Sequence, residues 1–246
     1  MRPGRRRRSL AGYLTMPAFL AAVLLALWAW VNAQTLDSIE RRRANMDFII
    51  TATREHIALT FTSTLIVLMI SIPVGIMLTR PWARGITPPA VAVFNIGVAI
   101  PSIGLVTIFA LVWDLGFWPM VAALVAYAAL PVLRNTMVGL QQVDAAVIES
   151  ARGMGMTKRA VLTKIEMPLA VPVMLAGIRT ALVINVGTAA LATFIAGGGL
   201  GGILVVGISQ GRQLLVIVGA VLIAVLALLI DYLAGLAEDV LRPRGL

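Results

Sequence analysis

The sequence contains no cysteine and a single histidine, His56. Without cysteine the chain has no disulfide, no thiolate metal site and no cysteine nucleophile. A histidine that stands alone is more often a structural residue than a metal ligand or a catalytic base, and we expect His56 to lie at the start of a helix. No histidine and carboxylate follow one another at metal or triad spacing, which argues against an enzyme and against a metal site.

Charged residues are also scarce, and long apolar stretches make up most of the sequence. Only 13% of the 246 residues are charged, whereas 60% are hydrophobic, which is far from the composition of a soluble domain. Apolar segments of about 20 residues, the length that crosses a bilayer, recur along the chain. The sequence therefore predicts an all-α polytopic membrane protein embedded in a lipid bilayer.

Short joints rich in proline or glycine divide the apolar sequence into about six expected transmembrane helices. The first follows Arg2 and Arg5–Arg8 and is free of charge from residue 13 to 31. We favour a retained anchor, since this run is long for a signal peptide. Cleavage stays open, because Val31-Asn32-Ala33 resembles a cleavage site and the arginine pair faintly resembles a twin-arginine signal. The other spans are expected at 56–79, 88–112, 118–140, 168–196 and 213–236.

The chain divides into an N-terminal part and a core. Residues 1–50 are expected to form the anchor helix and an external linker, and the polar stretch 34–55 is expected to lie outside the membrane as an amphipathic or loose segment. Residues 51–246 hold a five-helix core with a polar loop at 141–167. The span 168–196 would be about 43 Å long as a helix, so its first turns are expected to project beyond the membrane.

The net charge of +9 is concentrated on one side once the N-terminus is placed in the cytoplasm. Fourteen basic residues then face the cytoplasm against five acidic ones, the external charges balance, and Arg179 and Asp231 cancel within spans. This positive-inside pattern argues against a nucleic-acid partner and places both termini and the polar loop in the cytoplasm. The cytoplasmic basic residues are Arg2, Arg5–Arg8, Arg80, Arg84, Arg134, Arg152, Lys158, Arg159, Lys164, Arg242 and Arg244.

The stretch 149–172 is polar within an otherwise apolar sequence. About two short helices are expected there, the first of which begins just before it. Asp144 can cap a first helix over Ala145–Arg152, because its carboxylate accepts hydrogen bonds from the free N–H groups of the first turn. Gly153 and Gly155 can take the positive φ that ends a helix at low cost. The first helix is therefore expected to stop within the run 153–155.

The second helix is expected to be capped by Thr157, and Pro168 cannot continue it in the usual way. Its apolar residues fall on one face and its cations on the other, as in an amphipathic helix. Two such helices between membrane spans form a shape suited to docking a partner. The apolar residues are Val161, Leu162 and Ile165, and the cations are Lys158, Arg159 and Lys164.

The spacing in this loop resembles the EAA loop of binding-protein-dependent ABC importer permeases. The family pattern is E-A-A-x3-G-x9-I-x-L-P, and here it reads Glu149-Ser150-Ala151, three residues, Gly155, nine residues and Ile165-Glu166-Met167-Pro168. Ser150 and Met167 depart from it by replacements of similar size. The resemblance covers about residues 55–240. It narrows to the osmoprotectant branch (glycine betaine, choline, carnitine) through LPVLRNT (130–136), GMGMT (153–157), MPLAVPVMLAGIRTAL (167–182) and ATFIAGGGLGG (192–202).

The resemblance implies a type I ABC importer transmembrane domain in a prokaryotic cytoplasmic (inner) membrane. The chain would be the permease subunit that takes up a small osmoprotectant, driven by ATP hydrolysis on partner subunits. Implied partners are cytoplasmic ABC ATPase subunits, a second permease subunit (identical or paralogous) and an extracytoplasmic substrate-binding protein. ATP and Mg would be held by the ATPase, because this chain has no GxxxxGK[ST] motif, and no cofactor is expected in the chain itself.

The resemblance also assigns roles within the loop. Glu149, Ala151 and Gly155 would form the contact with a groove on the ATPase, while Ile165 and Pro168 would anchor the loop to the spans. The span 168–196 could then move as a lever. The residues implied for coupling to the ATPase are Glu149, Ser150, Ala151, Gly155, Ile165 and Pro168.

Polar and helix-bending residues gather in the middle spans. Each alone is expected to join helices, as such residues commonly do in membranes, whereas the cluster as a whole is interpreted as a translocation pathway. Arg179 is interpreted either as a pathway contact or as a side chain that reaches back to the cytoplasm, with Asp231 as a possible partner. The candidate pathway residues are Asn95, Pro101, Ser102, Arg179, Asn185, Thr188 and Thr193.

The glycine run 197–202 contains GxGxxG but lacks the strand and helix of a dinucleotide site, so we expect an irregular external turn. Five Trp, three Tyr and seven Phe form no evident cage for a quaternary amine, and substrate choice is therefore expected to reside in the binding protein. Two alternatives stay open, a permease for another small solute (amino acid or other amine) and an ATP-independent secondary transporter or channel. The exact substrate, the gate and the choice between homodimer and heterodimer also stay open.

Overall fold

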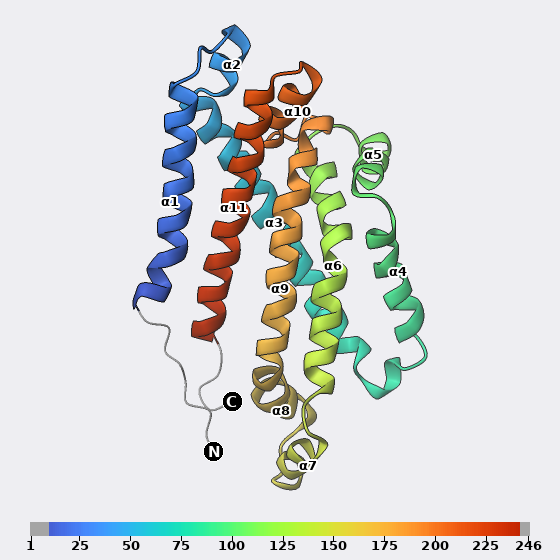
Figure 1. Ribbon diagram of the computed structural model, residues 1–246. Coiled ribbons are helices and arrows are strands. Elements are labelled where there is room, and N and C mark those ends of the chain that lie inside the picture. Colours follow the sequence, from blue (N-terminus) through green and yellow to red (C-terminus); the bar gives the residue numbers. More distant parts are fainter. Residues whose placement is uncertain (1–9, 242–246) are drawn as a thin grey trace.

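The computed structural model describes residues 10–241, and every regular element in this range is helical (Figure 1). Five helical segments of the described range are long and apolar enough to cross a bilayer, and the bent pair α4 and α5 makes a sixth if it is counted as one span. The prediction of an all-α fold with about six spans is confirmed. The helices are α1 Leu10–Asn32, α2 Ser38–Arg43, α3 Met46–Leu78, α4 Thr87–Ala99, α5 Ser102–Trp113, α6 Phe117–Gln141, α7 Ala145–Gly153, α8 Lys158–Val161, α9 Met167–Ala189, α10 Gly201–Ser209 and α11 Gln213–Leu241.

The two ends of the bundle differ in what they carry. The short helices α7 and α8 lie at the same end as the start of α1 and the end of α11, whereas α2 and α10 lie at the opposite end (Figure 1). This is the arrangement that the charge-based topology requires of the polar loop and the terminal helices. Part of that charge count rests on Arg2, Arg5–Arg8, Arg242 and Arg244, which lie outside the described residues.

Helix α6 is the centre of the bundle, with α3 and α9 packed along it and α4 and α5 against it (Figure 1). Glycines on the neighbouring helices make the closest approaches. A Cβ on Gly75 of α3 would lie 2.9 Å from Thr136 Cβ, and one on Gly177 of α9 would lie 2.6 Å from Asn135 Cβ. Small residues allow helices to approach closely in a membrane, where the hydrophobic effect does not drive association. The segment 130–136 is thus fixed by packing on both sides.

Helix α3 begins at Met46, and the expectation of a start near residue 56 after a loose segment is wrong. Asn45 caps it, since its side chain accepts a hydrogen bond from the Asp47 N–H at 2.7 Å. Phe48 and Ile49 pack against the apolar cluster of α10 and α11, and this tertiary contact extends the helix through a polar sequence. His56 therefore lies inside the helix, fully buried, and not at its start.

Residues 197–200 of the glycine run form an irregular turn, as predicted, whereas Gly201 and Gly202 already belong to α10. Helix α3 holds this turn. Gly199 has a φ of 91°, which glycine adopts without strain. Its N–H donates to Glu55 Oε2 at 2.8 Å, and the Leu200 N–H donates to His56 Nδ1 at 3.3 Å. The other ring nitrogen of His56 lies 2.8 Å from the Val186 carbonyl oxygen. His56 therefore joins α3, α9 and the turn.

The expected span at 88–112 is divided into α4 and α5 with a bend of 99° between them, at Pro101, which was interpreted as a helix-bending residue. Pro101 causes the break, because it has no N–H to continue the helix and favours an extended residue before it. Ile100 accordingly has φ −78° and ψ 132°. Helix α4 lies directly on α6, since a Cβ on Gly97 would be 2.1 Å from the Ala126 carbonyl oxygen.

Substituting Gly97→Ala is expected to destabilise the protein, because the added methyl group collides with backbone and not with a movable side chain. Overpacking of this kind costs about 1–3 kcal/mol, which thermal unfolding in detergent would detect as a lower midpoint. Gly104→Ala on α5 is the matched control, since the nearest atom to its Cβ is Ile100 Cγ2 at 3.7 Å. Equal midpoints for the two variants would contradict the close packing of α4 on α6.

Candidate functional site

The polar loop 141–167 projects from one end of the bundle as the helices α7 and α8 (Figure 1). Asp144 caps α7, because its Oδ1 accepts a hydrogen bond from the Ala146 N–H at 2.8 Å. Thr157 caps α8, because its Oγ1 accepts one from the Ala160 N–H at 3.2 Å. Both predicted caps are confirmed. The loop therefore has a defined local structure of its own.

The turn between α7 and α8 is made by Gly155, whose φ of 85° confirms the predicted left-handed conformation. Gly153 does not share this role, and that expectation is wrong. It is the last residue of α7, and Met154 follows at φ −76° before the chain turns. One left-handed residue is enough to reverse the chain here. The tip is apolar, since the Met154 side chain is 77% exposed.

The start of the EAA-like pattern presents a free carboxylate. Glu149 and Ser150 are exposed, and Glu149 makes no ion pair within residues 10–241. Ala151 is only 2% exposed and packs inside the loop, where its carbonyl oxygen accepts a hydrogen bond from the Met156 N–H at 3.2 Å. The small side chain of Ala151 thus lets the two halves of the loop approach each other.

Pro168 does not interrupt the second helix, contrary to the expectation. The helix continues from α8 through a π-helical turn at Leu162–Glu166, in which the Met167 N–H donates to the Leu162 carbonyl oxygen, and then into α9. Pro168 comes two residues after this π-helical turn, where the hydrogen-bond pattern of the helix already changes, so its missing N–H is tolerated. Such single π turns are often found at functional sites. A continuous helix therefore runs from the loop into the bundle.

The second helix has the predicted two faces. Val161 is fully buried, and Leu162 and Ile165 are half-buried, whereas the three cations are exposed. The apolar face therefore attaches the loop to the bundle and leaves its charged face available to a partner. The exposed cations are Lys158, Arg159 and Lys164.

An ion pair that the sequence did not reveal fixes the base of this loop. Arg80, just after α3, donates from Nη2 to Glu166 Oε2 at 2.7 Å, and the Glu166 side chain is only 7% exposed. The Arg80 Nε also donates to the Ile76 carbonyl oxygen at 3.2 Å. The two charged residues are 86 positions apart, so no local pattern could join them. The pair ties the π-helical turn to the end of α3.

Two of the candidate pathway residues join helices within the bundle. Asn185 is fully buried, and its Nδ2 donates to Ser63 Oγ and Thr64 Oγ1, each at 3.0 Å. Arg179 forms a two-pronged ion pair with Asp231, with Nη2 2.6 Å from Oδ2. The depths of Arg179 and Asp231 therefore match, and their pairing was anticipated as a possibility. Asn185 and Arg179 both hold α9 against a neighbour.

The remaining candidate pathway residues lie on different elements. The Asn95 Oδ1 on α4 accepts a hydrogen bond from Arg134 Nη2 at 3.2 Å. Pro101 and Ser102 form the break between α4 and α5. Thr188 lies near the end of α9, and Thr193 lies in the 3₁₀ turn Ala190–Ile195 that follows it. Arg134, which was counted among the cytoplasmic charges, lies within α6, seven residues before its end.

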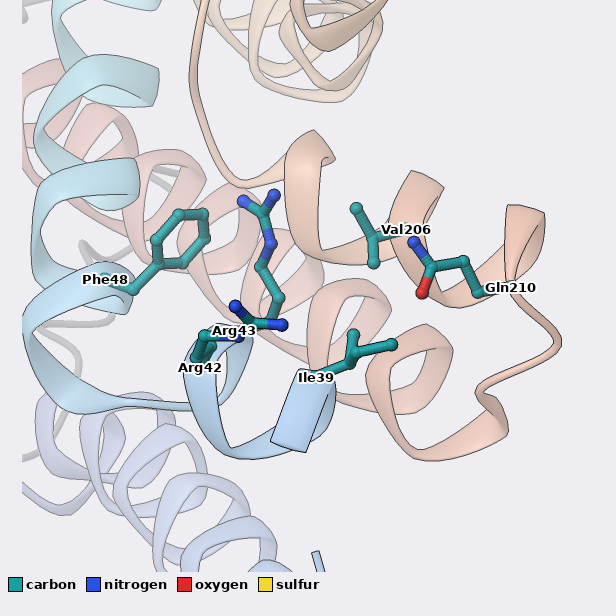
Figure 2. A pocket seen from close by; sticks show the side chains of 6 residues that line it. All are labelled: Ile39, Arg42, Arg43, Phe48, Val206 and Gln210. Atoms are coloured by element: carbon teal, nitrogen blue, oxygen red, sulfur yellow. The ribbon is translucent and has the colours of Figure 1, made fainter. Parts of the chain in front are cut away.

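At the end opposite the loop, α2 and α10 form the walls of a surface cavity of about 360 Å³. Figure 2 shows two arginine side chains between Phe48 on one side and Val206 and Gln210 on the other. The Arg43 guanidinium carbon lies 4.8 Å from the centroid of the Phe48 ring, a cation–π contact. The cavity is lined by Ile39, Arg42, Arg43, Phe48, Val206 and Gln210.

A capping box closes the nearby start of α2. The Glu40 N–H donates to Asp37 Oδ1 at 2.8 Å, and Arg212 Nη1 lies 2.7 Å from Asp37 Oδ2. The Glu40 N–H, with the Ile39 N–H and Arg212 acting in the same direction, lowers the pKa of Asp37. The lowered pKa favours the ionised form of Asp37, which is the form that pairs with Arg212. Within residues 10–241, no group of three or more His, Asp and Glu side chains is placed to hold a metal ion.

Curated proteins similar to this chain are transport permeases. The choline transport system permease protein OpuBB of Bacillus subtilis is 37% identical over 194 residues, which cover 79% of this chain and 88% of that protein. The osmoprotectant import permease protein OsmY of Salmonella typhimurium is 37% identical over 211 residues, covering 86% and 87%. The carnitine transport permease protein OpuCD of Listeria monocytogenes is 36% identical over 206 residues, covering 83% and 92%.

Solved structures share the fold. The MetNI methionine ABC transporter in an inward-facing crystal form superposes with a TM-score of 0.72 at 23% identity, covering 85% of this chain and all of that one. An amino acid ABC transporter crystallised with histidines gives a TM-score of 0.68 at 18% identity, covering 84% and 99%. The family model for binding-protein-dependent transport system inner membrane components matches residues 71–244. The chain therefore belongs to this family of transport permease subunits.

Proposed function

We propose that this chain is the permease subunit of an ATP-driven importer for a small osmoprotectant such as glycine betaine, choline or carnitine. The loop formed by α7 and α8 carries the proposal, because it follows the coupling pattern and stands at the end of a continuous helix that enters the bundle. The substrate class is carried over from relatives that are named for choline, carnitine and osmoprotectant transport. ATP and Mg would be bound by the partner ATPase.

The loop would dock in a groove of a cytoplasmic ATPase. Glu149 is exposed and free to pair with a basic residue in that groove, and Ser150 lies beside it. The turn at Gly155 would present the apolar tip of the loop to the ATPase. Ala151 was expected in the contact itself, but because it is only 2% exposed we propose that it supports this surface from inside. This orientation requires the loop and both termini to be cytoplasmic.

Movement of the ATPase would then reach the bundle along two routes. The first is the helix from α8 into α9, to which Ile165 and Pro168 attach the loop. The second is the pair of Arg80 and Glu166, which joins the base of the loop to α3. Helix α3 is about 50 Å long at 1.5 Å per residue, and its far end holds the glycine turn through Glu55 and His56.

Two further partners complete the proposed importer. A second permease, identical or paralogous, would enclose the pathway together with this chain. An extracytoplasmic binding protein would deliver the solute at the end that carries α2 and α10. Within the chain, residues 1–50 would form an anchor and external linker, and residues 51–246 the transport core.

Glu149→Gln is expected to reduce ATP-driven uptake about tenfold or more while the protein stays in the membrane. The reason is that hydrogen bonds to charged groups contribute about 1.5–3 kcal/mol, and 1.4 kcal/mol corresponds to a tenfold change. Gly155→Ala should act in the same direction, because alanine at a φ of 85° is strained. The measurement is uptake and ATP hydrolysis by the reconstituted transporter with its ATPase and binding protein.

Asp239→Asn provides the control for Glu149→Gln, since Asp239 is an exposed carboxylate on a different element, at the end of α11 and outside the loop. It should leave the ratio of solute imported to ATP hydrolysed unchanged. Normal uptake in both Glu149→Gln and Gly155→Ala would contradict the docking role. Uptake that followed an ion gradient in the absence of the ATPase would contradict the proposed function as a whole.

Breaking the ion pair of Arg80 and Glu166 is expected to lower the number of solute molecules imported per ATP hydrolysed. Removing one partner of a buried pair costs about 3–5 kcal/mol, and we expect the lower end because Arg80 is 28% exposed. Arg80→Gln and Glu166→Gln should each show the defect. The double exchange Arg80→Glu with Glu166→Arg should recover most of the ratio.

Arg84→Gln is the control for these variants, because Arg84 is exposed and close in sequence to Arg80. It should import solute as efficiently as the unmodified chain. If the double exchange were no better than the single substitutions, the two residues would not act as a pair, and the second route would be refuted.

A further inference from the structure

Helices α4, α6 and α9 line a surface cavity of about 250 Å³ that the polar loop does not explain. Ligand pockets for drug-sized molecules measure about 300–1,000 Å³, so this one suits a solute of few heavy atoms. An arginine, an asparagine and a tyrosine line it together with apolar side chains. Its lining includes Val98 of α4, Tyr127 and Arg134 of α6 and Ile184 of α9.

Arg134 has no acidic partner within residues 10–241. Arg134 Nη2 donates a hydrogen bond to a neutral group, the Asn95 Oδ1, at 3.2 Å. Arg179 of α9 differs from Arg134, because the carboxylate of Asp231 pairs with it and balances its charge. An arginine within a span is costly, and such residues mark substrate pathways or paired charges. Arg134 is unpaired and exposed to the cavity, so it offers its guanidinium fork to a carboxylate from outside the chain.

Tyr127 lies seven residues before Arg134 on the same face of α6. It is half-buried, and its hydroxyl makes no hydrogen bond to any described residue. The two Cα atoms are about 10.5 Å apart along the helix. Side chains on a helix lean toward its N-terminus, so Arg134 leans toward Tyr127. An aromatic ring attracts a quaternary ammonium group, and Tyr127 supplies that ring beside the cation that would take a carboxylate.

We propose that this cavity is a subsite for a zwitterion in transit, with the carboxylate on Arg134 and the quaternary ammonium on Tyr127. The inference rests on the proposed function and narrows its substrate class to betaines, which carry both groups, over choline, which lacks the carboxylate. Asn95 limits the affinity, because its amide oxygen competes with the solute for the same guanidinium. The solute can therefore leave Arg134 again, although the guanidinium charge lies within a span.

The first test compares uptake of glycine betaine and choline by the complete transporter in proteoliposomes. Arg134→Gln is expected to slow betaine uptake roughly tenfold and choline uptake much less. Tyr127→Leu should slow both solutes, and Tyr127→Phe, which keeps an aromatic ring, should slow neither. Arg54→Gln is the control, an exposed arginine of α3 outside the cavity. Equal losses for the two solutes in Arg134→Gln, or no loss of betaine uptake, would overturn the proposal.

The second test measures binding directly and does not depend on transport. The chain has no cysteine, so Val98→Cys gives a single thiol at the wall of the cavity. In the assembled transporter, glycine betaine should slow thiol labelling of Val98→Cys. This protection should be lost when Arg134→Gln is added. Equal protection with and without Arg134→Gln, or no protection in either, would overturn the subsite.

The two tests separate the subsite from the proposed function. If the unmodified transporter failed to import any of these solutes with ATP while betaine still protected Val98→Cys, the proposed function would fail and the subsite would stand. If uptake were ATP-driven and selectivity unaffected by Arg134→Gln, the subsite would fail and the proposed function would stand.

Discussion

The rest of the structure depends on one continuous helix, which leaves the polar loop at Lys158 and runs into the middle of the bundle as α9. A helix satisfies its own backbone hydrogen bonds and so can cross from water into a bilayer without exposing polar groups. The π-helical turn and Pro168 adjust its path without ending it. Force applied to the loop therefore has a stiff route into the membrane.

Close packing around α6 connects the continuous helix of α8 and α9 to the rest of the bundle. Gly177 lets α9 touch α6 at Asn135, and Gly75 lets α3 touch the same segment at Thr136. Arg80 and Glu166 then join α3 to the base of the loop at one end. In hydrocarbon, where apolar side chains gain nothing by leaving the lipid, such backbone approaches and polar pairs are what hold helices together. The polar loop, the segment 130–136 of α6 and the glycine turn are parts of one packed unit.

Features that depend on composition or on a few neighbouring residues could be predicted from the sequence. The apolar runs predicted the all-α fold, Asp144 and Thr157 predicted their caps, and Gly155 predicted its turn. Features that depend on distant contacts could not. Helix α3 extends through a polar stretch because Phe48 packs on other helices, and Pro168 is tolerated because a π turn precedes it.

The candidate site residues also divide into those whose positions depend on sequence neighbours and those whose positions depend on distant contacts. The loop residues follow one another closely in the sequence, so their joint position was predictable, although the burial of Ala151 was not. The pathway residues come from several spans, and their exposure depends on how each helix is rotated in the bundle. Asn185 consequently faces α3, whereas Arg134, which was counted only as a cytoplasmic charge, lines a cavity.

The side of the membrane on which the loop lies tests the account most directly. Because the chain has no cysteine, Lys164→Cys and Gln210→Cys each introduce a single exposed thiol, one on the loop and one beside α10. With a thiol reagent that does not cross membranes, intact cells should label Gln210→Cys alone, and inverted vesicles should label Lys164→Cys alone. Labelling of Lys164→Cys from outside intact cells would place the loop beyond the reach of any cytoplasmic ATPase and would contradict the account.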